Sequence, residues 1–173
     1  MRNKKRREIS KEEKIWVIRA GVGGEADHLF LSAGMIVLRD PGMGNLKKLP
    51  NRRKAFYEAY EKLRPDETLT GIAGIGGKFF RFVHEVAVGD LVLYPSLKDK
   101  HLHIGRIKGR YRYSNRPDSN FPHQRQVIWV CSVAKWDLSE FANRELGAAR
   151  TFFRLKNHAA EIRQVLARRH ARR

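Results

Sequence analysis

The stretch "GDLVLYPSLKDKHLHIGRIKGRYRY", residues 89–113, decides the fold class. Its first part, GDLVLYPSL, has the apolar run of a strand. Its second part, HLHIGRIKGRYRY, alternates apolar with polar residues, which is typical of another strand. The turn between them is Lys98-Asp99-Lys100, and a further strand is expected at 125–134 after a polar loop with two prolines. Strands that follow one another through turns predict an antiparallel, barrel-like arrangement.

A glycine turn near the N-terminus suggests a competing hypothesis, a dinucleotide-binding site. The apolar run at 15–18, part of a strand expected at 15–19, leads into the pattern G-x-G-x-x-A, formed by Gly21, Gly23 and Ala26. Asp40 stands about where such a site places its ribose-binding carboxylate. A Rossmann fold needs a continuing series of βαβ units, and the chain beyond Pro65 does not supply one. We therefore interpret the glycines as a tight turn into a short helix at 25–33, whose backbone N–H groups can hold a phosphate.

The other expected elements lie on both sides of the strand-rich centre. In chain order they are a strand at 35–38, a helix at 51–64, a glycine-rich connection at 68–82, a short helix at 137–147, a strand at 149–155 and a final helix at 157–169. Within the connection, GIAGIGGK (71–78) resembles a phosphate-binding P-loop. Ile72 and Phe79 break that pattern, so we expect a flexible loop that leaves Lys78 and Arg81 available for phosphates.

The charge balance indicates a polyanionic partner. The 173 residues include 36 Lys and Arg against 18 Asp and Glu, a net charge of +18. Nucleic acid is the expected partner, with DNA favoured over RNA, and a membrane surface or an acidic protein is the alternative. The chain has no apolar run that could span a membrane and no apolar signal core, which predicts a cytoplasmic, nucleoid-associated protein. The single cysteine, Cys131, excludes a disulfide within these residues.

The chain is expected to form one domain with basic ends. Residues 1–14 are interpreted as a flexible tail, 15–156 as a nucleic-acid-binding domain and 157–173 as a basic C-terminal helix. Cations and aromatic residues interleave at 105–126, where cations can position phosphates and aromatic faces can stack bases. The alternative is a solvated strand face whose tyrosines pack sideways. The candidates in this segment are Arg110, Tyr111, Arg112, Tyr113, Arg116, Phe121, His123 and Arg125.

Catalytic and metal sites find little support in the sequence. His101 and His103 can share one face of a strand, yet no cysteine or carboxylate cluster nearby completes a metal site. The run Glu12-Glu13-Lys14 has residue types that nucleases use, but it lies in the predicted tail. We therefore predict no catalytic residue, no metal and no cofactor.

The order of these parts resembles a known family. After "WVIRAGVGGEADHLFLSAGMIVL" come "RF-x-x-E-x-x-x-GDLV", "IGRIKGRYRY", "FPHQRQVIWV" and "DLS…LGAARTFFRL". This succession, over about residues 15–156, is similar to the PUA-like (EVE/YTH-related) domain at the N-terminus of Mrr-type, modification-dependent restriction endonucleases. The resemblance implies an α+β fold with a mixed β-barrel of about five to six strands, flanked by short helices.

The resemblance also implies a pocket that holds a flipped or modified base. Where such domains commonly place a tryptophan after the second strand, this chain has Arg39 and Asp40, which can read a base edge by hydrogen bonds. We expect the end of the strand at 35–38, the end of the strand at 89–97 and the loop before 125–134 to meet there. The alternative is that Tyr94 packs in the core and that Arg39 pairs with Asp40 at the surface. The expected pocket residues are Arg39, Asp40, Tyr94, Ser96, Phe121 and His123.

The function implied is that of a reader, the specificity module of a restriction or defence system, with a nuclease domain or subunit as its partner. Two alternatives belong to other classes. One is a basic protein that coats RNA or DNA without base preference, and the other is an enzyme that modifies nucleic acid. Base preference separates the first alternative from a reader, and cleavage or modification in the presence of a divalent metal separates the second.

Overall fold

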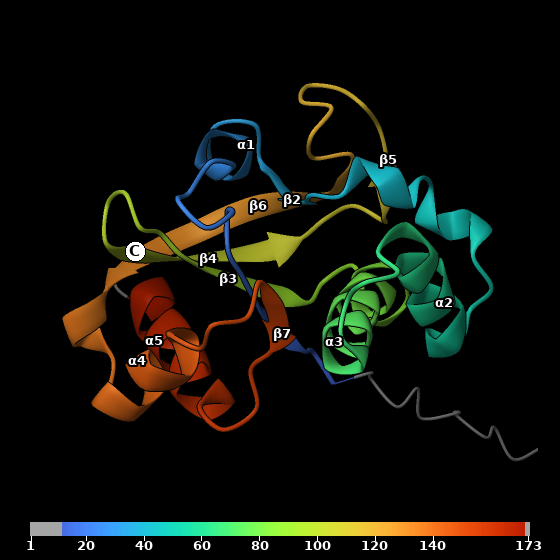
Figure 1. The fold of residues 1–173 in the computed structure, drawn as a ribbon. Coiled ribbons are helices and arrows are strands. Elements are labelled where there is room, and N and C mark those ends of the chain that lie inside the picture. Colours follow the sequence, from blue (N-terminus) through green and yellow to red (C-terminus); the bar gives the residue numbers. More distant parts are fainter. Residues whose placement is uncertain (1–11, 172–173) are drawn as a thin grey trace, which may run out of the picture.

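A computed structural model describes residues 12–171 of the chain (Figure 1). The predicted tail falls mostly on residues 1–11, which lie outside the described residues. Its last residue, Lys14, already joins the fold, because its N–H donates to Asp90 Oδ1 at 3.1 Å and its carbonyl accepts from Leu91 N at 2.9 Å. Among the described helices, none is long and apolar enough to cross a membrane.

The strands form one curled mixed sheet, a half-barrel that confirms the predicted α+β class. They are β1 (Ile15–Ile18), β2 (Met35–Leu38), β3 (Leu91–Pro95), β4 (His101–Ile107), β5 (Arg112–Tyr113), β6 (His123–Ala134) and β7 (Phe152–Arg154). Their order is β2-β6-β4-β3-β1-β7, and β5 pairs with β6 outside this path. β1 and β3 are parallel, whereas the other pairings are antiparallel. The predicted antiparallel succession of β3, β4 and β6 is therefore confirmed.

The strands β1 and β3 consist of apolar and aromatic residues, and both faces of the sheet are covered there. In β1, Trp16 and Ile18 join one buried cluster, while Ile15 and Val17 join another on the opposite face. The first cluster includes residues of α1 (Asp27–Leu31), α2 (Arg53–Leu63) and α3 (Leu69–Phe80), and the second includes residues of α4 (Glu140–Leu146) and α5 (Ala159–Ala171). Figure 1 shows α4 and α5 on the side of the sheet away from α1. The C-terminal helix α5 thus packs onto the core of the domain, with Ile162 fully buried.

The turn at Gly89 and Asp90, just before β3, holds the parallel strands β1 and β3 together. Gly89 adopts a left-handed φ of 97°, which a residue without a Cβ tolerates, and this turn places Asp90 inside the protein. The Asp90 carboxylate, 5% exposed, accepts from Trp16 Nε1 at 2.8 Å, from Ala87 N at 2.9 Å and from Lys14 N. One buried carboxylate therefore connects β1, β3 and the segment that precedes β3.

The prediction of a glycine-rich connection at 68–82 was wrong, because this segment is helix α3 followed by one π-type turn, Arg81–Glu85 (η3). Thr68 caps the helix by accepting from Gly71 N at 3.0 Å. The glycines let α3 approach α2 closely. A Cβ at Gly76 would lie 3.1 Å from the backbone of Phe56 and 2.6 Å from the Tyr57 ring. Close helix packing thus offsets the low helix propensity of glycine.

Other elements differ from the prediction mainly in length. The helix expected at 25–33 spans Asp27–Leu31, and the strand expected at 101–113 is divided into β4 and β5. The division arises because Lys108 N and Gly109 N both donate to the Gln126 carbonyl, at 2.9 and 3.2 Å, which interrupts the regular ladder. Short 3₁₀ helices complete the fold: η1 (Pro41–Met43), η2 (Leu46–Lys48) and η4 (Lys135–Asp137).

Candidate nucleic-acid interface

A pocket of about 560 Å³ opens where distant parts of the chain meet. The end of β2, the end of β3 and the loop before β6 all reach it, as the sequence predicts. The candidates that line it are Arg39, Asp40, Lys78, Tyr94 and Phe121. Its volume lies within the roughly 300–1,000 Å³ of ordinary ligand sites.

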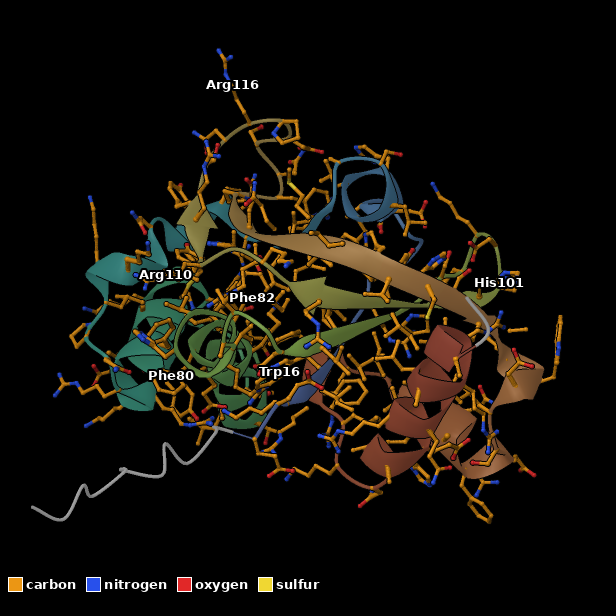
Figure 2. All side chains as sticks on the ribbon, turned by 180° about the vertical axis from the view of Figure 1, so that it is seen from behind. Trp16, Phe80, Phe82, His101, Arg110 and Arg116 are labelled. Carbon is orange, nitrogen blue, oxygen red and sulfur yellow. The ribbon has the colours of Figure 1, made fainter. Side chains whose placement is uncertain are left out.

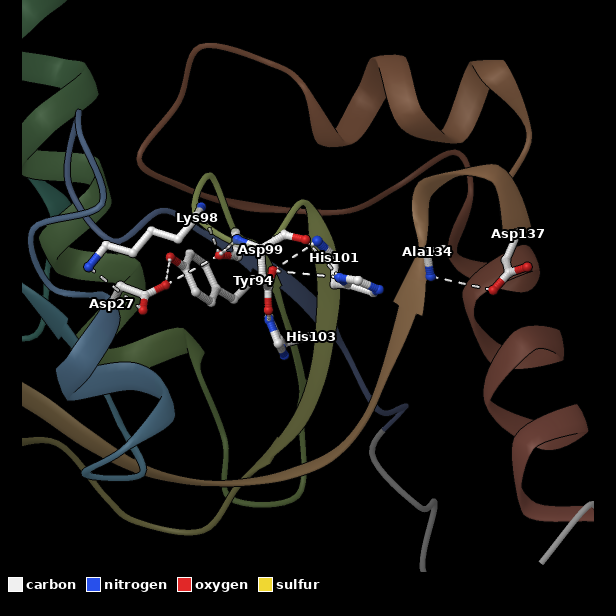
Figure 3. A network of polar contacts seen from close by, with 9 residues as sticks. Asp27, Tyr94, Lys98, Asp99, His101, His103, Ala134 and Asp137 are labelled. Carbon is white, nitrogen blue, oxygen red and sulfur yellow. Dashed lines mark hydrogen bonds and ion pairs between the residues drawn. The ribbon is translucent and has the colours of Figure 1, made fainter.

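The floor of the pocket is apolar and is held in place by a polar network behind Tyr94 (Figure 3). The Tyr94 hydroxyl donates to Asp27 Oδ1 at 2.6 Å, and Lys98 Nζ lies 4.0 Å from the other oxygen of Asp27. Phe30 packs edge-on against the Tyr94 ring, and His103 stacks on it at 5.8 Å. Burial and the hydrogen bond to Asp27 raise the pKa of Tyr94, so the hydroxyl stays protonated. Tyr94 is therefore a fixed wall, and its faces are taken by neighbours.

The rim beside β2 carries paired charges. Lys78 Nζ, reaching in from α3, lies 3.8 Å from Asp40 Oδ2. Burial lowers the pKa of Lys78, and the Asp40 carboxylate opposes that change. The Arg39 guanidinium lies 5.3 Å from the centre of the Phe121 ring, so an exposed cation covers a buried aromatic face. This edge offers an ammonium donor, a carboxylate acceptor and a planar guanidinium on which a base can stack.

Asp40 holds this position through a strained backbone and a buried histidine. Its φ of 86° is left-handed, which is uncommon for a residue other than glycine. The Asp40 carbonyl accepts from His123 Nε2 at 3.0 Å. Since a carbonyl only accepts, Nε2 carries the proton, Nδ1 accepts from the Tyr111 hydroxyl at 2.9 Å, and the Tyr111 oxygen accepts from Leu46 N at 3.3 Å. Burial lowers the pKa of His123 to about 4, so the ring is neutral at pH 7.

The glycine turn after β1 also lines the pocket, but the carboxylate of Glu25 already accepts a hydrogen bond from the backbone of this turn. Glu25 Oε2 accepts from Gly23 N at 3.1 Å, and a Cβ at Gly21 would lie 1.9 Å from the same oxygen. Backbone hydrogen bonds from Glu25 and Gly23 lower the pKa of this carboxyl group. β1 and β2 are not neighbours in the sheet, which agrees with rejection of the Rossmann hypothesis.

Sequence reasoning missed two cations at the pocket, Arg19 and Arg150. Arg19 follows β1, and its Nη2 donates to the carbonyls of Leu146 and Ala148 at 3.2 and 2.9 Å. Arg150 is exposed in the connection before β7. Neither lies in a recognisable motif. The pairing of β7 with β1 brings them to the same pocket, and the sequence gives no local signal of that pairing. With Arg39 and Lys78 they give the pocket four cations against the carboxylates of Glu25 and Asp40.

Several predicted site residues are structural. Ser96, 1% exposed, lies behind Tyr94 and donates to Asp27 Oδ1 at 3.3 Å. Arg125, 3% exposed, donates to the carbonyls of Phe82, Val83 and Gly109 at 2.7, 3.0 and 3.1 Å. Burial lowers the pKa of Arg125 to about 10, which leaves it charged at neutral pH. Tyr111 and His123 are buried too, so these four residues support the pocket without lining it.

The remaining candidates lie elsewhere on the surface. Arg110 and Arg112 are exposed, and Arg116 extends from the loop between β5 and β6, well away from the buried Trp16 and Phe82 (Figure 2). Tyr113 is half-buried, with its ring 5.7 Å from His123. Arg81, also half-buried, follows α3, and burial lowers its pKa, with Arg53 adding to the effect.

A second, more open concavity of about 760 Å³ gathers a separate group of cations. Apolar residues at the end of η3 and just after it, from Val83 to Val88, line this concavity, and no carboxylate does. Its exposed cations are Lys47, Lys108 and Arg110, and the buried Arg125 lies beneath them. Such a surface is suited to the phosphates of a nucleic-acid backbone, which Lys and Arg neutralise.

The two histidines of β4 both hydrogen-bond to Asp99. His103 Nε2 lies 2.8 Å from Asp99 Oδ2, and His101 Nδ1 lies 2.8 Å from the Asp99 carbonyl (Figure 3). Within residues 12–171, no group of three or more His, Cys, Asp or Glu side chains is arranged to hold a metal ion.

Comparison with known proteins places the chain in a family by sequence. No curated protein matches it significantly. One family model, described as "Domain of unknown function (DUF8426)", matches residues 25–156. This match covers most of the chain, including the two parts of the pocket after β2 and β3 and its edge before β7. The chain therefore belongs to the DUF8426 family.

Proposed function

We propose that this protein binds nucleic acid and admits one extruded nucleotide into the pocket. The observation that carries the proposal is the combination found there: an apolar floor, an exposed guanidinium over Phe121, and an excess of cations at the rim. A nucleotide has the complementary parts, which are a flat base and an anionic phosphate. The net charge of +18 supports binding of a polyanion by the whole surface.

The two concavities suggest a division of work. The exposed cations of the second concavity, Lys47, Lys108 and Arg110, contact phosphates together with Arg112 and Arg116, and these contacts carry no sequence information. The pocket reads the base, with Asp40 accepting from an amino group and Lys78 donating to a ring or carbonyl acceptor. The succession of sequence segments resembles that of PUA-like, EVE-related domains of modification-dependent restriction enzymes, and this resemblance supports a base reader. It also favours DNA as the ligand and a nuclease domain or subunit as the partner.

The salt dependence of binding tests the electrostatic part of the proposal. If the surface neutralises about five to eight phosphates, the slope of log K against log [salt] on duplex DNA should be about −4 to −7. Fluorescence anisotropy with a labelled duplex, at several salt concentrations, measures this slope. An affinity that does not respond to salt would contradict binding to the backbone.

Asp40 and Arg116 should differ in the kind of binding that each controls. Asp40→Asn removes the carboxylate while keeping a residue type that tolerates a left-handed φ. It should change the relative affinities of duplexes that differ only in one central base or its modification. Arg116→Ala removes an exposed cation and should weaken every duplex by the same factor, about fivefold. If Asp40→Asn left the order of affinities unchanged, Asp40 would not read the base.

A further inference from the structure

Two aromatic side chains at the start of α4 and just before it are exposed to solvent. Trp136, in η4, is 85% exposed, and Phe141, in the first turn of α4, is 66% exposed. The protein's other tryptophans differ, since Trp16 is fully buried and Trp129 is half-buried. A large exposed aromatic surface is an ordinary sign of an interaction site.

A small cavity of about 100 Å³, here called the groove, adjoins the pocket. The groove and the pocket share part of their lining, namely Arg19, Pro95, Leu97 and Gly147. Lys135 and Asn143 also line the groove. Lys135 directly precedes Trp136 in the chain, so the residue that carries the exposed indole follows a residue of the groove lining. Arg19 lies at the junction of the two concavities and supplies a cation there.

The segment that carries Trp136 is fixed by hydrogen bonds. Asn143 Nδ2 donates to the carbonyl of Lys135 at 2.8 Å, which ties η4 to α4. Asp137 accepts from Ala134 N at 3.4 Å and from Arg169 Nη2 at 3.1 Å, and Figure 3 shows the first of these contacts. A fixed backbone lowers the entropy lost when a ligand contacts the side chain.

Cations accompany the aromatic surface. Lys135 is exposed where it lines the groove. The Arg144 guanidinium lies 5.7 Å from the centre of the Phe141 ring and also pairs with Glu140 Oε1 at 2.8 Å. Alternating cations and aromatic faces are the arrangement that binds single-stranded nucleic acid, where bases stack on rings and cations track the phosphates. An unpaired strand presents base faces to a ring, whereas a duplex keeps its bases stacked on one another.

From this continuity we infer that the groove guides the strand next to the extruded nucleotide, and that Trp136 stacks on an unpaired base of that strand. The inference rests on the proposed function, because it takes the pocket as the place where the strand begins. It adds a single-strand contact surface to a site otherwise defined by one nucleotide.

Trp136 fluorescence provides a direct readout. Titration of the full chain with a ten-nucleotide single strand, at fixed salt, should quench the emission, because a stacked base contacts the exposed indole. In Trp136→Phe the remaining tryptophans are buried or half-buried, so the quenching should largely disappear while binding, followed by anisotropy, persists.

Affinities of three variants complete the test. Trp136→Ala should weaken the single strand by about tenfold, the loss of one base stack. Leu69→Ala is the matched control, since Leu69 is 81% exposed at the start of α3 and lines neither the pocket nor the groove. Ala149→Trp narrows the pocket from an exposed position and should also weaken the strand. Circular dichroism confirms that each variant folds.

The outcomes separate the two proposals. If Ala149→Trp weakens binding but Trp136→Ala does not, the strand path is wrong and the pocket proposal stands. If Trp136→Ala weakens binding but Ala149→Trp does not, the proposed function fails at the pocket and the strand path from it falls too. A change in sedimentation of the Trp136→Ala variant without ligand would show that the aromatic surface joins protein chains, which overturns the inference.

Discussion

Replacing Asp90 with alanine is expected to destabilise the protein by about 4 kcal/mol. The carboxylate satisfies three donors, Trp16 Nε1, Lys14 N and Ala87 N, in a place that is 5% exposed. Alanine leaves these donors without an acceptor, and each buried unsatisfied donor costs about 1–3 kcal/mol. Because β1 pairs with both β3 and β7, the change weakens the sheet on both sides of β1. Urea denaturation followed by circular dichroism measures the loss.

Two comparisons make this prediction specific. Asp90→Asn keeps one acceptor oxygen and should lose less stability than Asp90→Ala. Asp66→Ala removes an exposed carboxylate between α2 and α3 and should change the free energy of unfolding by less than about 0.5 kcal/mol. Equal effects for Asp90→Ala and Asp66→Ala would show that the carboxylate does not join the strands.

Acidification is expected to remove about 3 kcal/mol of stability through His123 between pH 7 and pH 4. In the folded protein burial lowers the pKa of His123 to about 4, against 6.5 for an unperturbed histidine. As the pH falls below 6.5 the unfolded chain binds a proton that His123 in the folded protein does not bind. The contribution of the neutral ring to the free energy of unfolding is therefore progressively lost. Below pH 4 both states are protonated and the loss stops growing.

The variant His123→Gln isolates this titration. Glutamine does not titrate in this range and can still donate and accept, while other acid-sensitive groups remain in both proteins. The stability difference between the wild type and His123→Gln should therefore shrink by about 3 kcal/mol from pH 7 to pH 4 in urea denaturation series. A difference that stays constant with pH would mean that folding does not lower the pKa of His123.

The antiparallel succession of β3, β4 and β6 was predictable because turn residues and apolar runs are local signals. Lys98-Asp99-Lys100 separates two recognisable strands, and β3 and β4 pair as expected. The parallel pairing of β1 with β3 had no such signal, since it joins distant parts of the chain. The hydrogen bond from Trp16 Nε1 to Asp90 supports this pairing, and only the fold shows that bond. Helix α3 was missed because its glycines, unfavourable in an isolated helix, are required by the close approach of α2.

The pocket was predictable in its parts but not in its chemistry. Arg39, Tyr94 and Phe121 meet there because strand ends at one edge of a curled sheet converge. Sequence alone could not show that Arg125 and His123 would be buried. A cation or histidine beside a strand has the same sequence pattern whether it points to solvent or binds backbone carbonyls. Arg19 and Arg150 were missed since only the β1–β7 pairing brings them together.

Extrusion of a base into the pocket is the central claim, and it makes binding depend on how firmly the target base is paired. Unpairing and unstacking cost a few kcal/mol, and least for a mismatched base. Ala149→Trp fills the pocket from an exposed lining position. Ala73→Trp is the matched control, since Ala73 is exposed on α3 and lines neither of the two concavities.

The most direct measurement compares the affinities of these proteins for two duplexes at fixed salt, one fully paired and one with a single central mismatch. The wild type and Ala73→Trp should bind the mismatched duplex about tenfold more tightly, because less free energy is spent on extrusion. Ala149→Trp should bind both duplexes equally, at the affinity set by backbone contacts alone. If the wild type does not distinguish the duplexes, or if Ala149→Trp distinguishes them as well as the wild type does, the pocket does not receive a base.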